Sequence, residues 1–247
     1  MNDAAADDRT LAQLRPPSRT RYFDGKLLTA RDLERDQAYS RGADAQLARL
    51  VLGGGVVCGL AVTTASDGGR PGVRIEAGLA LDHWGRRIVV PEDVEFIPLA
   101  PVDRDDEPSS PGARSELTVW LRQQTRAAEI VPGLGPGTLE QAEAGAWIEG
   151  YSLEVCAGAP PAANRGCSEA VFDLLCEGRP GEALQHLAAA TCADPPTDPS
   201  VVLAGISVGP GGELTVNAAP RVVVPTNLLL LELIARLAAR VEASFGG

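Results

Sequence analysis

The chain is poor in the residues that carry most enzyme chemistry. It has only two histidines, His83 and His186, and no H-E-x-x-H motif. His83 follows Asp82 in a predicted turn, where neighbouring side chains point in different directions, so we expect a solvated histidine there rather than a proton relay. We expect His186 on the surface of a helix. Because catalysis needs several convergent groups of suitable pKa, the sequence predicts that the protein is not an enzyme and has no catalytic residue.

Basic residues are also scarce. The chain has 22 Lys and Arg against 33 Asp and Glu, which gives a net charge of -11, and such a surface repels phosphate backbones and anionic lipid headgroups. We therefore expect no nucleic acid and no membrane insertion. No apolar run reaches membrane-spanning length, and residues 1–10 carry three aspartates and no apolar run, unlike a secretory signal. We expect a cytoplasmic protein.

The five cysteines give little indication of a metal site or a disulfide framework. Their number is odd and they include no C-x-x-C pair. Zinc held by Cys156, Cys167, Cys176 and Cys192 is an alternative, as is a disulfide within this segment, but structural zinc normally uses close-spaced pairs. The acidic run 103–107 lacks the glycine and glutamate spacing of a calcium loop. We therefore predict free or buried thiols, no metal and no cofactor.

Aromatic residues make up only 4% of the chain, and most of them fall on predicted strand or helix positions where core packing is the usual role. This gives little support to a sugar-binding surface. Trp84 is the exception, because it stands at a predicted hairpin tip. We expect it to be an exposed contact residue.

What the chain does contain is 27 glycines and 19 prolines, which predict many turns and a β-containing protein rather than a helical bundle. Thr29 and Asp32 have the spacing of a capping box, and glycines at 53–55 end the apolar pattern that follows, so we expect a helix over 30–52. Apolar or alternating segments predict short strands of one small sheet at 56–62, 73–76, 79–81, 88–90 and 96–97. The turn residues 82–86 predict a hairpin between two of these strands.

The second half of the chain predicts further strands at 117–121 and 147–155, not necessarily adjacent. The most secure hairpin joins 201–208 to 213–216 across a glycine-rich turn. Two short helices are expected at about 168–177 and 180–190, and one more strand at 221–224.

We expect an α+β fold, mainly antiparallel β hairpins and small sheets, with an N-terminal helix and a C-terminal amphipathic helix. The expected organisation follows the chain in order: an extended arm at 1–20, a helix plus small β domain at 21–100, a linker at 101–114, a second β region at 115–225 with a cysteine-containing helical insertion at about 156–198, and a helix at 226–247.

The leucine-rich segment 228–245 is the strongest helix signal. Leu230, Ile234, Leu237 and Val241 recur at intervals of four, three and four, the seam of a coiled coil. We expect this helix to mediate a homo-oligomer, either a dimer or a trimer, with its nearly all-apolar first half buried against the β body. An amphipathic helix packed wholly on its own domain is the alternative.

A second expected contact surface precedes the first helix. The polar segment 1–20 has too little apolar surface to fold alone, so we expect an arm that docks on a neighbouring subunit. It leads into Tyr22 and Phe23. We interpret Asp24 and Gly25 as a turn whose glycine adopts a positive φ, which lets the two aromatic residues pack against the helix.

Several ordered blocks resemble a known family. Residues 21–33 read Arg-Tyr-Phe-Asp-Gly-Lys-Leu-Leu-Thr-Ala-Arg-Asp-Leu, and 55–62 read Gly-Val-Val-Cys-Gly-Leu-Ala-Val. Together with 78–90, these blocks are similar to a family of structural or baseplate-associated bacterial proteins encoded with phage-tail-like extracellular contractile injection systems. Later blocks at 149–155, 201–204 and 221–224 also resemble that family. This sequence departs from the family where Leu52-Gly53-Gly54-Gly55 replaces a His-Gly-Trp-Gly-like string.

The resemblance implies a structural subunit at the baseplate or periphery of a contractile particle, with other particle subunits as partners and no chemistry to transfer. Such a particle assembles in the cytoplasm and can be released. The alternative function is a fibre-like surface-recognition module that binds a glycan or a target cell. The residues expected to mediate assembly are Tyr22, Phe23, Asp24, Gly25, Trp84, Leu230, Ile234, Leu237 and Val241.

Overall fold

The computed structural model describes residues 8–99, 115–132, 142–161, 169–209 and 212–245. Its helices are α2 (Ala30–Leu47), the π-helical turn η1 (Ala48–Leu52), α3 (Glu169–Cys176), α4 (Pro180–Ala189) and α5 (Asn227–Phe245). Its strands are β1 (Gly55–Gly59), β2 (Val62–Asp67), β3 (Arg70–Ile75), β4 (Gly78–Leu81), β5 (Arg87–Val90), β6 (Val94–Pro98), β7 (Ser115–Pro132), β8 (Ala142–Ala157), β9 (Val201–Val208) and β10 (Leu214–Asn217). The expected α+β class is confirmed. The expected linker at 101–114 lies outside the described residues.

The first six strands form two small antiparallel sheets, so the single sheet expected from the sequence is wrong. One sheet has the order β1-β4-β5 and the other β2-β3-β6. The break comes at Leu60, whose φ of 57° lies outside the β region, so the chain leaves one sheet there and enters the other. The expected hairpin across residues 82–86 is confirmed as β4–β5, in which Gly78 pairs with Val90 and Leu81 with Arg87.

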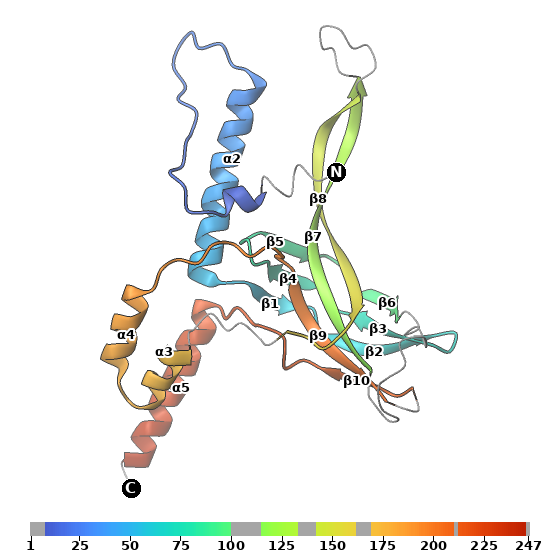
Figure 1. The fold of residues 1–247 in the computed structure, drawn as a ribbon, viewed down its shortest axis with the longest axis vertical. Helices are drawn as coiled ribbons and strands as arrows, with labels where there is room; N and C mark the ends of the chain where they lie inside the picture. The colour runs from blue at the N-terminus through green and yellow to red at the C-terminus, as the bar shows by residue number, and fades with distance from the viewer. Residues whose placement is uncertain (1–7, 100–114, 133–141, 162–168, 210–211, 246–247) are drawn as a thin grey trace.

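A four-stranded antiparallel sheet of order β10-β9-β7-β8 forms the second β region. β7 and β8 are longer than the sequence indicated, and they pair directly with each other as far as Pro132 and Ala142. β9 covers only the first part of β7, as far as the pair of Leu121 with Val201. Residues 122–132 and 142–152 therefore leave the body as a two-stranded ribbon, the tall hairpin of Figure 1.

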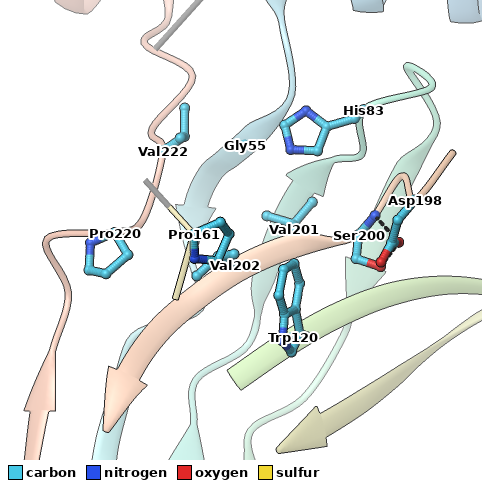
Figure 2. A pocket seen from close by; sticks show the side chains of 10 residues that line it. All are labelled: Gly55, His83, Trp120, Pro161, Asp198, Ser200, Val201, Val202, Pro220 and Val222. Atoms are coloured by element: carbon cyan, nitrogen blue, oxygen red, sulfur yellow. Dashed lines mark hydrogen bonds between the residues drawn. The ribbon is translucent and has the colours of Figure 1, made fainter. Parts of the chain in front are cut away.

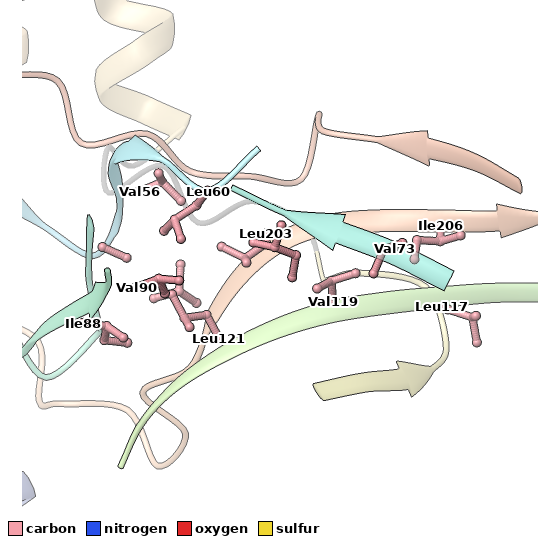
Figure 3. Close-up of a cluster of buried hydrophobic side chains, with 13 residues drawn as sticks. Val56, Leu60, Val73, Ile88, Val90, Leu117, Val119, Leu121, Leu203 and Ile206 are labelled. Atoms are coloured by element: carbon pink, nitrogen blue, oxygen red, sulfur yellow. The ribbon is translucent and has the colours of Figure 1, made fainter. Parts of the chain in front are cut away.

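The small sheets pack against the four-stranded sheet around one hydrophobic core. Leu117, Val119 and Leu121 of β7 are buried at a period of two, as expected for one face of a strand. Figure 3 shows Val73 and Val90, from the two small sheets, among the side chains of this core. Both β regions contribute to the same cluster, so the folding of one depends on the other.

The helices lie at the edges of this β body. α2 extends from it on the same side as the ribbon, whereas α3, α4 and α5 lie beside and below the sheets at the lower left of Figure 1. α2 with η1 confirms the helix expected over 30–52, and α3, α4 and α5 confirm the three helices expected further along. The strand expected at 221–224 is wrong in extent, because pairing there is limited to a single parallel bridge between Val223 and Val56.

Candidate assembly surfaces

Residues 21–28, which we call the tip, lead into the N-terminal end of α2. The Asp32 carboxylate accepts hydrogen bonds from the backbone N–H (3.1 Å) and the hydroxyl (2.7 Å) of Thr29, which confirms the predicted helix start. Lys26 Nζ lies 2.9 Å from Asp32 Oδ1 and donates to the carbonyl oxygen of Arg21 at 3.3 Å. The Lys26 ammonium and the Thr29 donors hold the pKa of Asp32 well below its usual range. One lysine therefore ties the tip to the first turn of the helix.

The turn within the tip is closed by the Lys26 N–H, which donates to the carbonyl oxygen of Phe23 at 3.1 Å. Gly25 has a φ of 83°, which confirms the positive φ predicted for it after Asp24. Nothing lies within 4 Å of the place where a Cβ would stand. Backbone conformation, and not crowding, therefore favours glycine at this position.

The tip presents apolar side chains to solvent. Phe23 is 60% exposed and Leu27 is 85% exposed, while Tyr22 and Leu28 are about half exposed. Five residues line a shallow hollow of about 340 Å³ at this end of the molecule: Tyr22, Phe23, Asp24, Lys26 and Leu28. A set of exposed apolar residues held on a closed turn is typical of a contact surface.

The two aromatic residues of the tip differ in how they meet the helix. Tyr22 is about half exposed, and partial desolvation together with the nearby carboxylate of Asp36 in α2 raises the pKa of Tyr22. Tyr22 therefore lies near the helix as expected. The packing expected for Phe23 is wrong, because its side chain stays largely in solvent.

Residues 82–86, which we call the latch, connect β4 to β5 and are mostly buried. Asp82 is fully buried. Its Oδ1 accepts hydrogen bonds from the backbone N–H groups of Trp84 (2.9 Å) and Arg86 (2.8 Å), and its Oδ2 accepts one from Arg86 Nε (2.7 Å). The Arg86 guanidinium also lies 4.5 Å from the centre of the Trp84 ring. Burial raises the pKa of Asp82, and the charge of Arg86 opposes this shift.

Trp84 is not the exposed contact residue that the sequence predicted. It is 6% exposed, and its Nε1 donates to the carbonyl oxygen of Pro196 at 2.7 Å. The neighbouring His83 N–H donates to the carbonyl oxygen of Pro199 at 3.0 Å. The latch is buried because residues 193–199, which lead into β9, pack over it. We therefore assign Trp84 to the interior and no longer to the contact surface.

The described part of the N-terminal segment also packs on the latch. Asp8 Oδ2 lies 3.0 Å from Arg86 Nη1, and Arg49 Nε donates to the carbonyl oxygen of Ala12 at 3.2 Å. Ala12 is fully buried, and residues 8–11 are helical. The extended arm expected over 1–20 is therefore wrong for residues 8–12, which are helical or in a turn and pack on their own chain. Residues 14–19 have no regular secondary structure and are exposed.

α5 presents a second apolar surface. The expected burial of its first half against the β body is wrong, because the helix extends away from the sheets (Figure 1). Leu228 is 75% exposed, and the described apolar side chains of this half are all exposed: Leu228, Leu229, Leu230, Leu231, Leu233 and Ile234. Leu230 and Ile234, the first half of the predicted seam, are therefore free for contact. The side chains of Leu237 and Val241 lie outside the described part of the structure.

A third apolar surface, on the ribbon, was missed by sequence reasoning. Ile130, Val131, Trp147 and Ile148 are exposed there, and Trp147 is the most exposed of the four at 63%. The sequence predicted a strand from Trp147 onward but not the pairing of that strand with β7. Without this pairing, nothing indicated that the strand extends beyond the core.

A hollow of about 210 Å³ lies beside the start of β9 (Figure 2). It brings His83 near Asp198 and Ser200, which are residues of types used in nucleophilic catalysis. However, the Ser200 hydroxyl donates to Asp198, and Asp198 Oδ1 also lies 3.0 Å from Arg122 Nη1. The serine is therefore paired with the carboxylate and not with the imidazole. The lining residues are Gly55, His83, Trp120, Pro161, Asp198, Ser200, Val201, Val202, Pro220 and Val222.

Residues 205–209 spell Gly-Ile-Ser-Val-Gly, which matches the letters of a nucleophile elbow. An elbow holds its serine on a strained turn between a strand and a helix. Ser207 instead lies within β9, where it pairs with Glu116 of β7 and Thr215 of β10. The pattern therefore belongs to a regular strand.

Cys58, Cys156, Cys176 and Cys192 are exposed free thiols, and Cys167 lies outside the described residues. Within the described ranges, no cluster of three or more His, Cys, Asp or Glu side chains is arranged to hold a metal ion. None of the helices described here combines the length and the apolar character needed to cross a bilayer.

Comparison with known proteins gives only remote likenesses to solved structures. No family model matches the chain, and no curated protein matches it. Among solved structures, it is similar to a chain of "The baseplate complex from the type VI secretion system", with 13% sequence identity and a TM-score of 0.38 over 94% of this chain and 70% of that one. A likeness at this level establishes neither a shared fold nor a shared role.

Proposed function

We propose that the protein is a structural subunit, in the baseplate or at the periphery, of a phage-tail-like contractile injection particle, and that it acts through protein–protein assembly without catalysis. The resemblance of residues 21–33, 55–62 and 78–90 to proteins encoded with such particles supports the particle class. The mode of action is supported by one observation: exposed apolar side chains gather on three elements that extend from the β body, namely the tip, the ribbon and α5.

The exposed apolar side chains of the tip, the ribbon and α5 fit a subunit better than a free monomer. Monomeric proteins seldom leave large contiguous apolar patches in water. Burying one such side chain against a partner contributes roughly 1.5–3 kcal/mol. The tip, the ribbon and α5 therefore offer enough apolar area for stable assembly.

The tip is the part best prepared for contact. Its turn is closed by a hydrogen bond and tied to α2 through Lys26 and Asp32, so Phe23 and Leu27 are presented without ordering a loop on binding. Binding costs less when the contact residues are already ordered. Aromatic anchors on such surfaces often contribute most of the binding free energy.

Copies of this chain are among the proposed partners, through α5. Leu230 and Ile234 stand at d and a positions of the seam that the sequence continues at Leu237 and Val241. The described half of this seam is exposed, so it does not pack against another part of the same chain. Both a dimer and a trimer are compatible with a seam of this length.

The particle role is tested by incorporation. We expect mass spectrometry of purified sheath-containing particles to detect the protein in stoichiometric amount. Changing Phe23 and Leu27 together to Ser should leave thermal unfolding of the isolated protein unchanged and lower incorporation about tenfold. Val89→Ser, which removes an exposed apolar side chain on β5, is the matched control and should incorporate normally. Absence from particles, combined with binding on a glycan array, would instead support the surface-recognition function.

The oligomer is tested by sedimentation. Changing Leu230 and Ile234 to Glu should convert an oligomer into a folded monomer, because two charges then lie in the seam. Leu228 and Leu229, also exposed on α5 but off the seam, take the same two changes as a control and should leave the oligomer intact. A wild-type protein that already sediments as a monomer would contradict the proposed role of α5.

A further inference from the structure

The ribbon has an unprotected strand edge. β8 is the outermost strand of its sheet, and residues 142–150 pair with β7 on one side only. Among the strands that the structure describes, none pairs with the other side of β8. Nine residues of strand present about 30 Å of backbone N–H and C=O groups along such an edge. Natural proteins usually keep edge strands short or protect them, because an open edge recruits another strand.

In the ribbon, β8 differs from its neighbour β7 in the charge of its side chains. β7 carries Arg122 and Arg126 in the ribbon, and basic side chains are a common protection of an edge. Residues 142–150 contain no Lys, Arg or Pro and instead have Glu143 and Glu149. The open edge of β8 is therefore both unprotected and acidic.

The same glutamates disfavour a second copy of this chain as the occupant. Antiparallel pairing of 142–150 with itself, centred on Ala146, places Glu149 directly opposite Glu143. Parallel in-register pairing places each glutamate beside its own copy. Like charges directly opposite destabilise strand pairs, and the net charge of -11 adds to the repulsion.

We propose that the outer edge of β8 over residues 142–150 binds an extended basic segment of a different protein by adding it to the sheet as a further strand. Its backbone groups bond the unpaired N–H and C=O groups of β8, which is the source of affinity in β-augmentation. This inference goes beyond the proposed function, because it names the chemistry of one partner and does not depend on the particle.

The exposed side chains specify what such a segment carries. Trp147 and Glu149 are two residues apart and so lie on one face of the strand, and both are exposed. Lys or Arg side chains on the same face of the added strand pair with Glu149 and place their cations against the Trp147 ring. Ile148 lies on the other face, where it favours Val or Ile. The segment therefore alternates basic with β-branched residues.

The test uses the full chain and a short synthetic peptide that alternates Lys with Val. Hydrogen exchange measured with and without the peptide should show new protection at residues 142–150. The same peptide N-methylated at every residue keeps its charge but has no backbone N–H group to donate to β8 from either edge. It should bind at least about tenfold more weakly. A peptide that alternates Glu with Val should not bind.

Matched variants locate the site. Glu149→Lys should weaken binding of the Lys–Val peptide about tenfold. Glu92→Lys makes the same charge change at an exposed residue between β5 and β6, outside the ribbon, and should have little effect. Where the Lys variant does not fold, Glu149→Gln provides the comparison and should show a smaller loss.

Three results would overturn the proposal. These are equal binding of the methylated and unmethylated peptides, equal losses for the variants at 149 and 92, and protection elsewhere in the chain or none at all. The first two results would indicate attraction by net charge only. Because no particle is used, failure here is distinct from failure of the incorporation experiment.

Discussion

The tip and the latch are built from the same parts but lie in opposite environments. Beside the tip, Asp32 accepts hydrogen bonds from Thr29 and pairs with Lys26, and within the latch Asp82 accepts them from Trp84 and Arg86 and pairs with Arg86. In each, the cation lies against an aromatic ring. Lys26 Nζ stands 5.8 Å from the centre of the Tyr22 ring, and the Arg86 guanidinium stands 4.5 Å from that of Trp84. Each turn also contains a glycine of nearly equal φ, 83° at Gly25 and 84° at Gly85.

The two turns differ in what surrounds them, which is protein for the latch and largely solvent for the tip. α2 and residues 193–199 pack over the latch, so its charges are removed from water and depend on each other. The apolar side chains of the tip lie in solvent, and its ion pair is less completely buried: the Asp32 side chain is 16% exposed, whereas that of Asp82 is 1% exposed. The same local chemistry therefore makes a structural joint in one place and a presented surface in the other. We therefore expect substitutions in the latch to destabilise the folded protein and substitutions in the tip to weaken binding of a partner.

The largest expected difference between the two turns comes from removing their aspartates. Asp82→Ala leaves the Arg86 guanidinium and two backbone N–H groups without their buried acceptor, so we expect a loss of about 3 kcal/mol or more in the free energy of unfolding. Asp32→Ala should cost less, because the Asp32 side chain is 16% exposed and water can replace part of its contacts, whereas that of Asp82 is 1% exposed. Urea unfolding of both variants measures the difference. Equal losses would show that the latch is not the more tightly coupled turn.

The two glycines have nearly the same φ but different steric surroundings, which allows a direct comparison. A Cβ at Gly85 would stand 2.0 Å from the carbonyl oxygen of Ala45 in α2, whereas nothing lies within 4 Å of a Cβ at Gly25. Gly25→Ala should cost about 1 kcal/mol through its positive φ alone. Gly85→Ala carries the same backbone strain plus the clash with α2, for which we expect about 3 kcal/mol in total. Thermal unfolding measures both, and an unchanged melting curve for Gly25→Ala would contradict the role of its φ.

The smallest expected effect is a difference in pH dependence. Hydrogen bonds from Lys26 and Thr29 lower the pKa of Asp32 below its ordinary 3.8. The stability that ionised Asp32 contributes is therefore present above pH 3.8 and is lost as the pH falls below that value. Burial raises the pKa of Asp82 above 3.8, so the native state gains stability as the pH falls through that raised pKa.

Substitution by Asn removes each titration in turn. The stability deficit of Asp32→Asn relative to the wild type should shrink below about pH 4, and that of Asp82→Asn should grow as the medium becomes more acidic. Denaturant unfolding at several pH values checks both trends. Deficits that change in the same direction would contradict the assignment of the two environments.

Local signals in the sequence were sufficient wherever a feature depends on residues close together in the chain. The capping box of Thr29 and Asp32, the positive φ of Gly25 and the β4–β5 hairpin were each predicted correctly. Each arises from contacts between residues a few positions apart or from one residue's backbone preference. The predicted roles of these residues in assembly stay predictions.

Features that depend on distant segments were not predictable in this way. Trp84 was expected in solvent, but it is buried by a contact with Pro196, 112 positions away. Its environment depends on where residues 193–199 cross the hairpin. The split into two small sheets at Leu60, and the extension of β8 beyond the core, likewise depend on which strands find each other.

The sequence by itself determined the turns, the helix ends and the α+β class, because dihedral preferences, caps and hydrophobic periodicity act over a few residues. Only the tertiary structure decided which of two similar aspartate turns is covered, which apolar residues remain in water and which strand edge is open. Burial is the reason for this division. Whether a side chain is buried depends on the surfaces that meet it, and those surfaces come from parts of the chain that local patterns do not relate to one another.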